Sequence, residues 1–106
     1  MGILSSLMGS MGAMMGDQLY PVYENARRFD ARSLENIITD NTNKIYVRTV
    51  HLLVLMGKNR YRACELYKQN KHQFDNGLAS IYNCRKFQRV IDEFRRIVAS
   101  SSGSNY

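Results

Sequence analysis

The hydrophobic residues in the last quarter of the chain recur at helical spacing. From position 84 onward they follow one another at steps of three, three, one, three and four residues, which is the period of a buried helix face. The pattern therefore predicts a helix from Leu78 to Ala99. Its apolar face comprises Cys84, Phe87, Val90, Ile91, Phe94 and Val98, and its opposite side carries Arg85, Arg89 and Arg96.

Two shorter helices are predicted before residue 40. The first, PVYENARRF, begins at Pro21, a residue that suits the first turn of a helix. The second, SLENIITD, can be capped at its N-terminus by Asp30 or by Ser33. Their apolar faces are Val22, Ala26 and Phe29 in the first helix and Leu34, Ile37 and Ile38 in the second.

The segment KIYVRTVHLLVLMG is the most apolar part of the chain and admits two interpretations. Its β-branched residues favour a strand. Its length of about 13 residues, its terminal Gly57 and its helical neighbours favour a buried helix. We expect a helix at 44–56, placed centrally because only Lys44, Arg48 and His51 form a polar strip on it. Gly57 would then supply a left-handed C-terminal cap.

The next segment, RYRACELYKQNKHQF, is also periodic. Asn59 can cap a helix that starts here, and the DNG sequence at 75–77 predicts a turn after it. The expected buried face comprises Ala63, Leu66, Tyr67 and Phe74, and the expected polar face Arg62, Glu65, Lys68, Gln69 and His72.

Together these patterns predict an all-α protein of four or five helices. A chain of 106 residues suits one domain with a modest core. We place the helical domain at 17–99, after an apolar leader rich in Met and Gly at 1–16 and before a flexible Ser/Gly tail at 100–106.

The charge of the chain is unevenly distributed. Residues 1–43 carry three arginines and five acidic residues, whereas residues 44–106 carry twelve Lys or Arg and four acidic residues. A basic half of this kind indicates a polyanionic partner, such as nucleic acid, an acidic protein surface or anionic lipid. The competing explanation is that the charge only keeps the protein soluble.

The segment around residues 57–72 gives the polyanion hypothesis its chemistry. Lysine and arginine neutralise phosphates, and a tyrosine such as Tyr61 can stack on unpaired bases, whereas Tyr67 is expected in the core. We therefore expect nucleic acid first and an acidic protein surface second, with Arg60 and Arg62 exposed. The candidate binding residues are Lys58, Arg60, Arg62, Lys68, Lys71, Arg85, Arg89 and Arg96.

The residues that could carry catalysis or bind a metal do not form a known motif. Cys64, Cys84, His51 and His72 lack the close spacing that preorganises a zinc site. The two cysteines fall on apolar faces, so we expect buried thiols in a reducing compartment, the cytoplasm or the nucleus. The sequence accordingly predicts neither an enzyme nor a cofactor, and it has no apolar run of about 18 residues that would span a membrane.

The leader suggests a different function. It is uncharged, with five methionines and four glycines, and an apolar segment of this kind is expected to dock on a partner. Gly2 and Ser6 fit the pattern for N-myristoylation. The alternative function is therefore an adaptor or assembly protein that docks on a protein complex or peripherally on an anionic membrane. The docking residues would be Ile3, Leu4, Leu7, Met8, Met11, Met14 and Met15.

Overall fold

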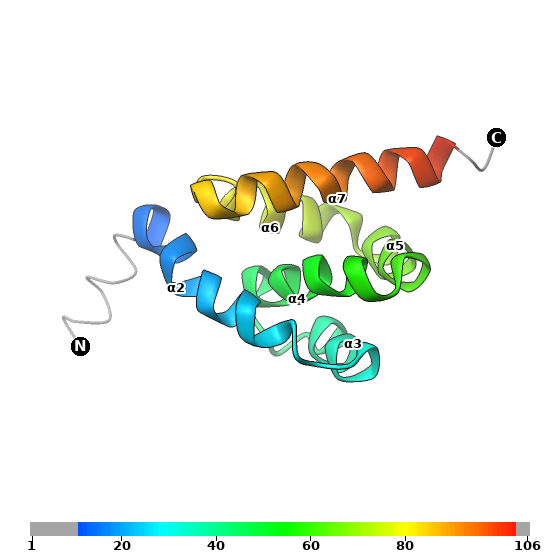
Figure 1. Ribbon diagram of the computed structural model, residues 1–106, viewed down its shortest axis with the longest axis horizontal. Coiled ribbons are helices and arrows are strands. Elements are labelled where there is room, and N and C mark those ends of the chain that lie inside the picture. Colours follow the sequence, from blue (N-terminus) through cyan, green and yellow to red (C-terminus); the bar gives the residue numbers. More distant parts are fainter. Residues whose placement is uncertain (1–10, 104–106) are drawn as a thin grey trace.

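The protein is built from α-helices packed around one central helix. The computed structural model describes the backbone of residues 11–103 and the side chains of residues 18–101. Over that range it contains six helices and no strand, so the predicted all-α fold is confirmed (Figure 1). The helices are α2 (Met11–Ala26), α3 (Ala31–Thr39), α4 (Ile45–Lys58), α5 (Arg60–Gln69), α6 (Lys71–Ile81) and α7 (Arg85–Gly103).

Helix α4 forms the centre of the core. It contacts each of the other five helices, and Figure 1 shows it between α2 and α3 on one side and α7 on the other. Every residue of α4 from Arg48 to Met56 is buried. The ambiguous segment is therefore a helix, and its nearly continuous apolar surface is covered on all sides. Each fully buried side chain, such as Leu52 or Leu55, contributes about 1.5–3 kcal/mol.

The polar strip expected on α4 lies largely inside the protein. Arg48 is only 4% exposed. Its Nε donates to the carbonyl oxygen of Ile38 at 2.6 Å, its Nη1 donates to Gln73 Oε1 at 3.4 Å, and its guanidinium lies over the ring of Phe74. These contacts replace water around the buried cation. Arg48 thereby connects α4 to the C-terminal end of α3 and to α6.

Asn59 separates α4 from α5. Its Oδ1 accepts a hydrogen bond from the backbone N–H of Arg62 at 3.1 Å, which confirms the predicted N-terminal cap. The predicted role of Gly57 is wrong, because Gly57 lies within α4 and no described glycine has a positive φ. The helix continues beyond it because the N–H of Asn59 bonds to the carbonyl oxygen of Leu55 at 2.7 Å.

The segment predicted as one helix up to Phe74 is divided into α5 and α6. The break falls at Asn70, and the predicted turn at 75–77 is part of α6. Gly77 serves the packing of α6 on α4: a Cβ there would overlap with Thr49 Oγ1 and lie 3.1 Å from Thr49 Cβ. This glycine allows close helix contact and does not form a turn.

Helix α7 keeps the predicted apolar face but has different ends. Its buried positions are Phe87, Ile91 and Phe94, with Cys84, Val90 and Val98 half-buried beside them. Leu78, predicted as its start, belongs to α6, and α7 continues to Gly103. Residues 100–103 of the predicted tail are therefore helical. The remainder, residues 104–106, lies outside the described residues.

Helix α2 begins earlier than predicted. It starts at Met11, and Pro21 lies inside the helix instead of in its first turn. Tyr20 and Tyr23 pack with Phe87 of α7, with ring centroids 5.5–5.6 Å apart. The leader residues Gly2, Ile3, Leu4, Leu7 and Met8 lie outside the described residues, whereas Met11, Met14 and Met15 belong to the backbone of α2.

Asp30 settles the start of α3. Its Oδ1 accepts a hydrogen bond from the backbone N–H of Ser33 at 2.8 Å, so Asp30 is the N-cap and Ser33 lies in the first turn. Leu34 and Ile38 of the predicted apolar face are buried, and Ile37 is half-buried. The short helix therefore packs on α4 with the face that the sequence predicted.

Candidate binding groove

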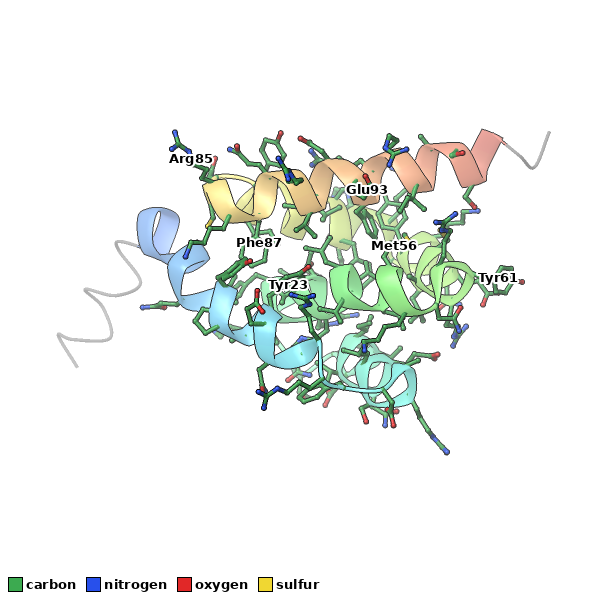
Figure 2. All side chains as sticks on the ribbon, viewed as in Figure 1. Tyr23, Met56, Tyr61, Arg85, Phe87 and Glu93 are labelled. Carbon is green, nitrogen blue, oxygen red and sulfur yellow. The ribbon has the colours of Figure 1, made fainter. Side chains whose placement is uncertain are left out.

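A groove runs between α7 and the surface formed by α2 and α4. Its middle is a hollow of about 500 Å³. Tyr23 of α2, Met56 of α4 and Glu93 of α7 lie around this space (Figure 2). The hollow is lined by Tyr23, Leu53, Met56, Gly57, Arg60, Arg89, Val90, Glu93, Phe94 and Ile97.

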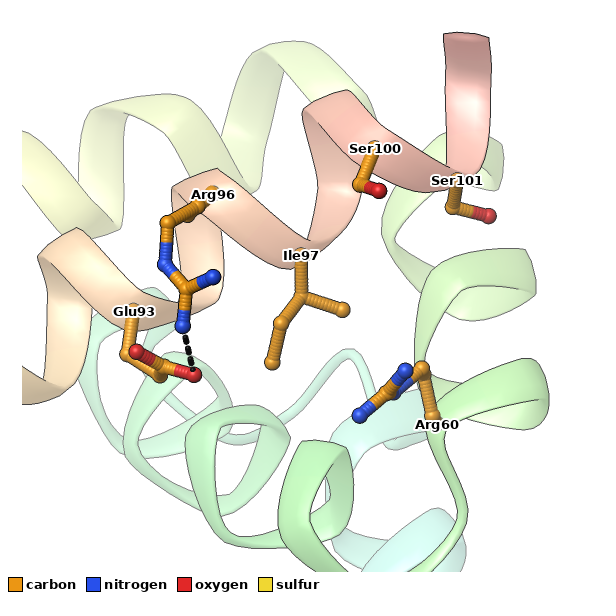
Figure 3. Close-up of a pocket in the computed structure, with 6 residues that line it drawn as sticks. All are labelled: Arg60, Glu93, Arg96, Ile97, Ser100 and Ser101. Atoms are coloured by element: carbon orange, nitrogen blue, oxygen red, sulfur yellow. Dashed lines mark hydrogen bonds and ion pairs between the residues drawn. The ribbon is translucent and has the colours of Figure 1, made fainter. Parts of the chain in front are cut away.

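Two smaller hollows of about 340 Å³ each adjoin the middle one. The first shares Arg60, Glu93 and Ile97 with it, and Figure 3 shows Arg60 and Ile97 pointing into the space between α5 and α7. The second shares Tyr23, Leu53 and Gly57 with it. The three hollows therefore form one continuous depression, called the central groove below. The outer hollows add Arg96, Ser100 and Ser101 on one side and Arg27, Val54 and Lys58 on the other.

The central groove has an apolar floor and a basic rim. The floor is made by Leu53, Met56, Val90, Phe94 and Ile97. Its rim carries five cations, and Glu93 is the one acidic residue that lines any of the three hollows. The cations are Arg27, Lys58, Arg60, Arg89 and Arg96.

Carboxylates neutralise two of the rim cations. Arg27 pairs with Glu24 at 3.4 Å, and Arg96 pairs with Glu93. The hydrogen bond from Arg96 lowers the pKa of Glu93, and the charge of Arg60 lowers it further. Within the part of the chain that the structure describes, the other three rim cations make no hydrogen bond or ion pair. These are Lys58, Arg60 and Arg89.

Gly57 contributes bare helical backbone to the wall of the groove. It is exposed, and a Cβ built on it would meet nothing within 4 Å. Because it borders two of the three hollows, its missing side chain widens the depression where they join.

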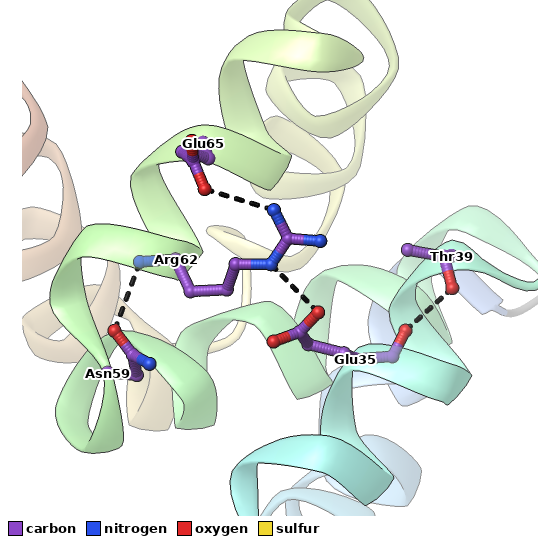
Figure 4. A network of polar contacts seen from close by, with 5 residues as sticks. All are labelled: Glu35, Thr39, Asn59, Arg62 and Glu65. Atoms are coloured by element: carbon purple, nitrogen blue, oxygen red, sulfur yellow. Dashed lines mark hydrogen bonds and ion pairs between the residues drawn. The ribbon is translucent and has the colours of Figure 1, made fainter.

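Arg62, a predicted polyanion ligand, instead connects two helices (Figure 4). Its Nε donates to Glu35 of α3 at 2.8 Å, and its Nη1 donates to Glu65 of α5 at 3.0 Å. The hydrogen bonds to Glu35 and Glu65 raise the pKa of Arg62. The side chain is only 35% exposed, so the expectation of an exposed Arg62 is wrong. The guanidinium of Arg62 is therefore engaged in the contact between α3 and α5.

The other predicted polyanion ligands lie away from the groove. Lys71 pairs with Asp75 at 2.9 Å. Burial raises the pKa of Asp75, but hydrogen bonds from Lys71 and Tyr67 outweigh this and lower it. Lys68 is exposed on α5, and Arg85 is exposed at the start of α7 (Figure 2); neither residue lines any of the three hollows. The structure thus brings together Lys58, Arg60, Arg89 and Arg96 of the predicted set.

The candidate metal ligands occupy separate elements. His51 lies on α4, Cys64 on α5, His72 on α6 and Cys84 in the turn before α7. Among the described residues no three His, Cys, Asp or Glu side chains form a group that could hold a metal ion. Both thiols are free; Cys64 is buried as predicted, and Cys84 is half-buried.

In the part of the chain that the structure describes, no helix combines the length and the hydropathy needed to cross a bilayer. Comparison with family models, with curated protein sequences and with solved structures found no match. The geometry and charge of the groove are therefore the basis on which a function is proposed.

Sequence analysis missed the floor of the groove. Leu53, Met56 and Val90 follow the same helical periodicity as the rest of the core, so nothing in the pattern separates lining residues from packed ones. Gly57 gave no separate signal, because a glycine after an apolar run is also the ordinary mark of a helix end.

Proposed function

We propose that the protein is a non-enzymatic interaction module that binds a polyanionic ligand through its basic half. The observation that carries the proposal is the gathering of Lys58, Arg60 and Arg89 around one groove, where none of the three forms a hydrogen bond or an ion pair with a described carboxylate. Lysine and arginine form charge-assisted hydrogen bonds with phosphates and carboxylates, and these bonds are about twice as strong as neutral ones. Nucleic acids and acidic protein segments both supply such groups.

A heparin oligosaccharide is a suitable probe because it supplies negative charge without bases or an apolar face. We expect it to bind at low salt, and we expect the affinity to fall steeply as salt is added, because bound counterions are released. Charge reversal of Arg60 and Arg89 to Glu should lower the affinity by more than about tenfold.

The matched control reverses Lys68 and Arg85 instead. These residues are also exposed and unpaired in the described part of the chain, and neither lines the groove, so the change in net charge is the same. A smaller loss in the control supports a localised site. Equal losses in the two variants would show diffuse attraction to the whole basic surface, and absence of binding at low salt would refute the proposal.

The docking of residues 1–16 on a protein complex or a membrane remains a second proposal, based on the sequence. It is independent of the groove, because a variant that lacks residues 1–10 keeps all residues that line the groove.

A further inference from the structure

We propose that the ligand of the central groove is an acidic amphipathic helix of a protein partner. This inference rests on the proposed function, since it names the class of polyanion that the same site takes. Three observations carry it: an exposed glycine in the wall of the groove, half-buried apolar residues that line it, and three rim cations that form no ion pair.

Gly57 is the exposed, penultimate residue of α4. At Gly77 the close approach of Thr49 explains the glycine. At Gly57 the φ angle is not positive, and apart from its chain neighbours and the nearby backbone of α4 no described atom comes within 4 Å of a built Cβ. A glycine at this place does, however, allow a bound backbone to approach α4 closely.

The floor of the groove favours a protein ligand over nucleic acid. Phosphates would meet Arg60 and Arg89 but would leave the half-buried side chains of Val90 and Ile97 in contact with water. The apolar stripe of an amphipathic helix covers such side chains.

The walls of the groove favour a helix over an extended segment. They are formed by α2, α4, α5 and α7, in which the backbone N–H and C=O groups away from the helix ends are bonded within each helix. An extended peptide gains most of its affinity from pairing with a free strand edge, and there is none along this groove. A helical ligand satisfies its own backbone groups and presents only side chains to the walls.

The charges on the rim define the polar side of the ligand. Lys58 lies on one side of the groove, Arg89 on the other, and Arg60 borders the middle hollow. Glu or Asp residues that flank the apolar stripe of the ligand would meet these cations. The leader of this chain does not fit that description, because residues 1–16 contain no acidic residue.

Two synthetic peptides test the inference. The first places Leu and Ala on one helical face and Glu on the flanks, and the second has the same composition in scrambled order. Because charge and composition are equal, a difference in affinity reports the helical pattern. We expect the patterned peptide to bind at least tenfold more tightly, as measured by fluorescence anisotropy of labelled peptide.

Substitutions of Gly57 test the location. Gly57→Phe fills the open space above α4, and we expect it to lower the affinity for the patterned peptide at least tenfold. Gly57→Ala, which adds a single methyl group, is the matched control and should reduce peptide affinity less. Thermal unfolding confirms that both variants are folded.

Equal affinity for the two peptides would overturn the inference, and so would unchanged binding of the patterned peptide to Gly57→Phe. A third result against it would be a single-stranded oligonucleotide that displaces the peptide and is itself excluded by Gly57→Phe, since the groove would then be a nucleic-acid site. In each of these cases heparin binding that depends on Arg60 and Arg89 would still support the proposed function, so the two failures are distinguishable.

Discussion

Gly57 and Gly77 occupy opposite environments, although both lie inside helices. The first faces open space, and the second is buried against Thr49. Gly57→Ala should stabilise the fold by up to about 1 kcal/mol, because alanine is the better helix former. Gly77→Ala should destabilise it by about 1–3 kcal/mol, because the added methyl group forces α6 away from α4. Urea denaturation midpoints of the two variants check both signs.

A double variant separates backbone propensity from packing at Gly77. Thr49→Ala removes the Oγ1 atom that the new methyl group would overlap, and with it the hydrogen bond to the carbonyl oxygen of Ile45. Gly77→Ala should therefore cost less in the Thr49→Ala background than in the wild type. If the cost is the same in both backgrounds, close contact with Thr49 is not the reason for the glycine.

His51 makes the stability of the fold depend on pH. Its ring is buried and stacks on the ring of Phe29. Its Nδ1 donates a hydrogen bond to the carbonyl oxygen of Val47 at 2.8 Å. Burial lowers the pKa of His51 below its ordinary value of 6.5, and the bond to Val47 opposes this only in part. The unfolded chain therefore binds a proton at a pH where the folded chain does not, and protonation favours unfolding.

We expect the free energy of unfolding to fall as the pH drops below 6.5. Carboxylates with a lowered pKa, among them Asp75 and Glu93, also make the free energy of unfolding depend on pH. Their protonation takes place at a lower pH than that of His51, because the ordinary pKa values of the two carboxyl groups are 3.8 and 4.5. In His51→Asn the loss between pH 6.5 and pH 5 should disappear, as measured by urea denaturation across that range. An unchanged slope would assign the effect to another group.

At the scale of the elements, Arg62 fixes α3 against α5. Its bond to Glu35 joins two helices, whereas the exposed pair of Arg96 and Glu93 lies within α7. A double-mutant cycle with Arg62→Met and Glu35→Gln should give a larger coupling free energy than the same cycle at Arg96 and Glu93. The interhelical pair is less exposed to solvent screening, and surface pairs contribute little.

If the two cycles give equal coupling, the contact between Arg62 and Glu35 does not hold the helices together. In that case, Arg62 would be available as a ligand for polyanions, as the sequence predicted. The affinity of Arg62→Met for heparin would then be reduced, whereas we expect it to stay within about twofold of the wild type because its charge is already neutralised.

The sequence predicted elements well where local pattern determined them. The length of 44–56 and its helical neighbours favoured a helix over a strand. Asn59 was predicted as an N-cap, and Asp30 was predicted with Ser33 as the alternative, because capping depends on near neighbours. The ends of α6 were missed for a tertiary reason. Gly77 resembles a turn residue in sequence, and only the approach of Thr49 explains its place in a helix.

The candidate site was predictable in its charges but not in its shape. Arg60 and Arg89 were expected to be exposed cations, as the structure has them. That they flank the same groove depends on how α5 and α7 pack, which the periodicity of each helix does not determine. The sequence did not predict the ion pair of Arg62 with Glu35, because the two residues are 27 positions apart in the chain.

For the whole molecule, the central position of α4 determines which helix is the last to open during unfolding. Since every other described helix packs on it, its amides become accessible only when the core opens as a unit. We expect the amides of Val50 to Leu55 to exchange most slowly in hydrogen-exchange experiments, with protection equal to the global free energy of unfolding. Slower exchange in α7 than in α4 would contradict this.

The central position of α4 also has a consequence for synthesis of the chain. When Lys58 has been added, only α2 and α3 precede α4, so the sides that α5, α6 and α7 will cover are still bare. About 45 residues remain before the end of α7 at Gly103. At about 5–20 residues per second this takes roughly two to nine seconds. During that interval the most apolar of the described helices lacks three of the helices that cover it, so its packing is completed only after α7 has been synthesised.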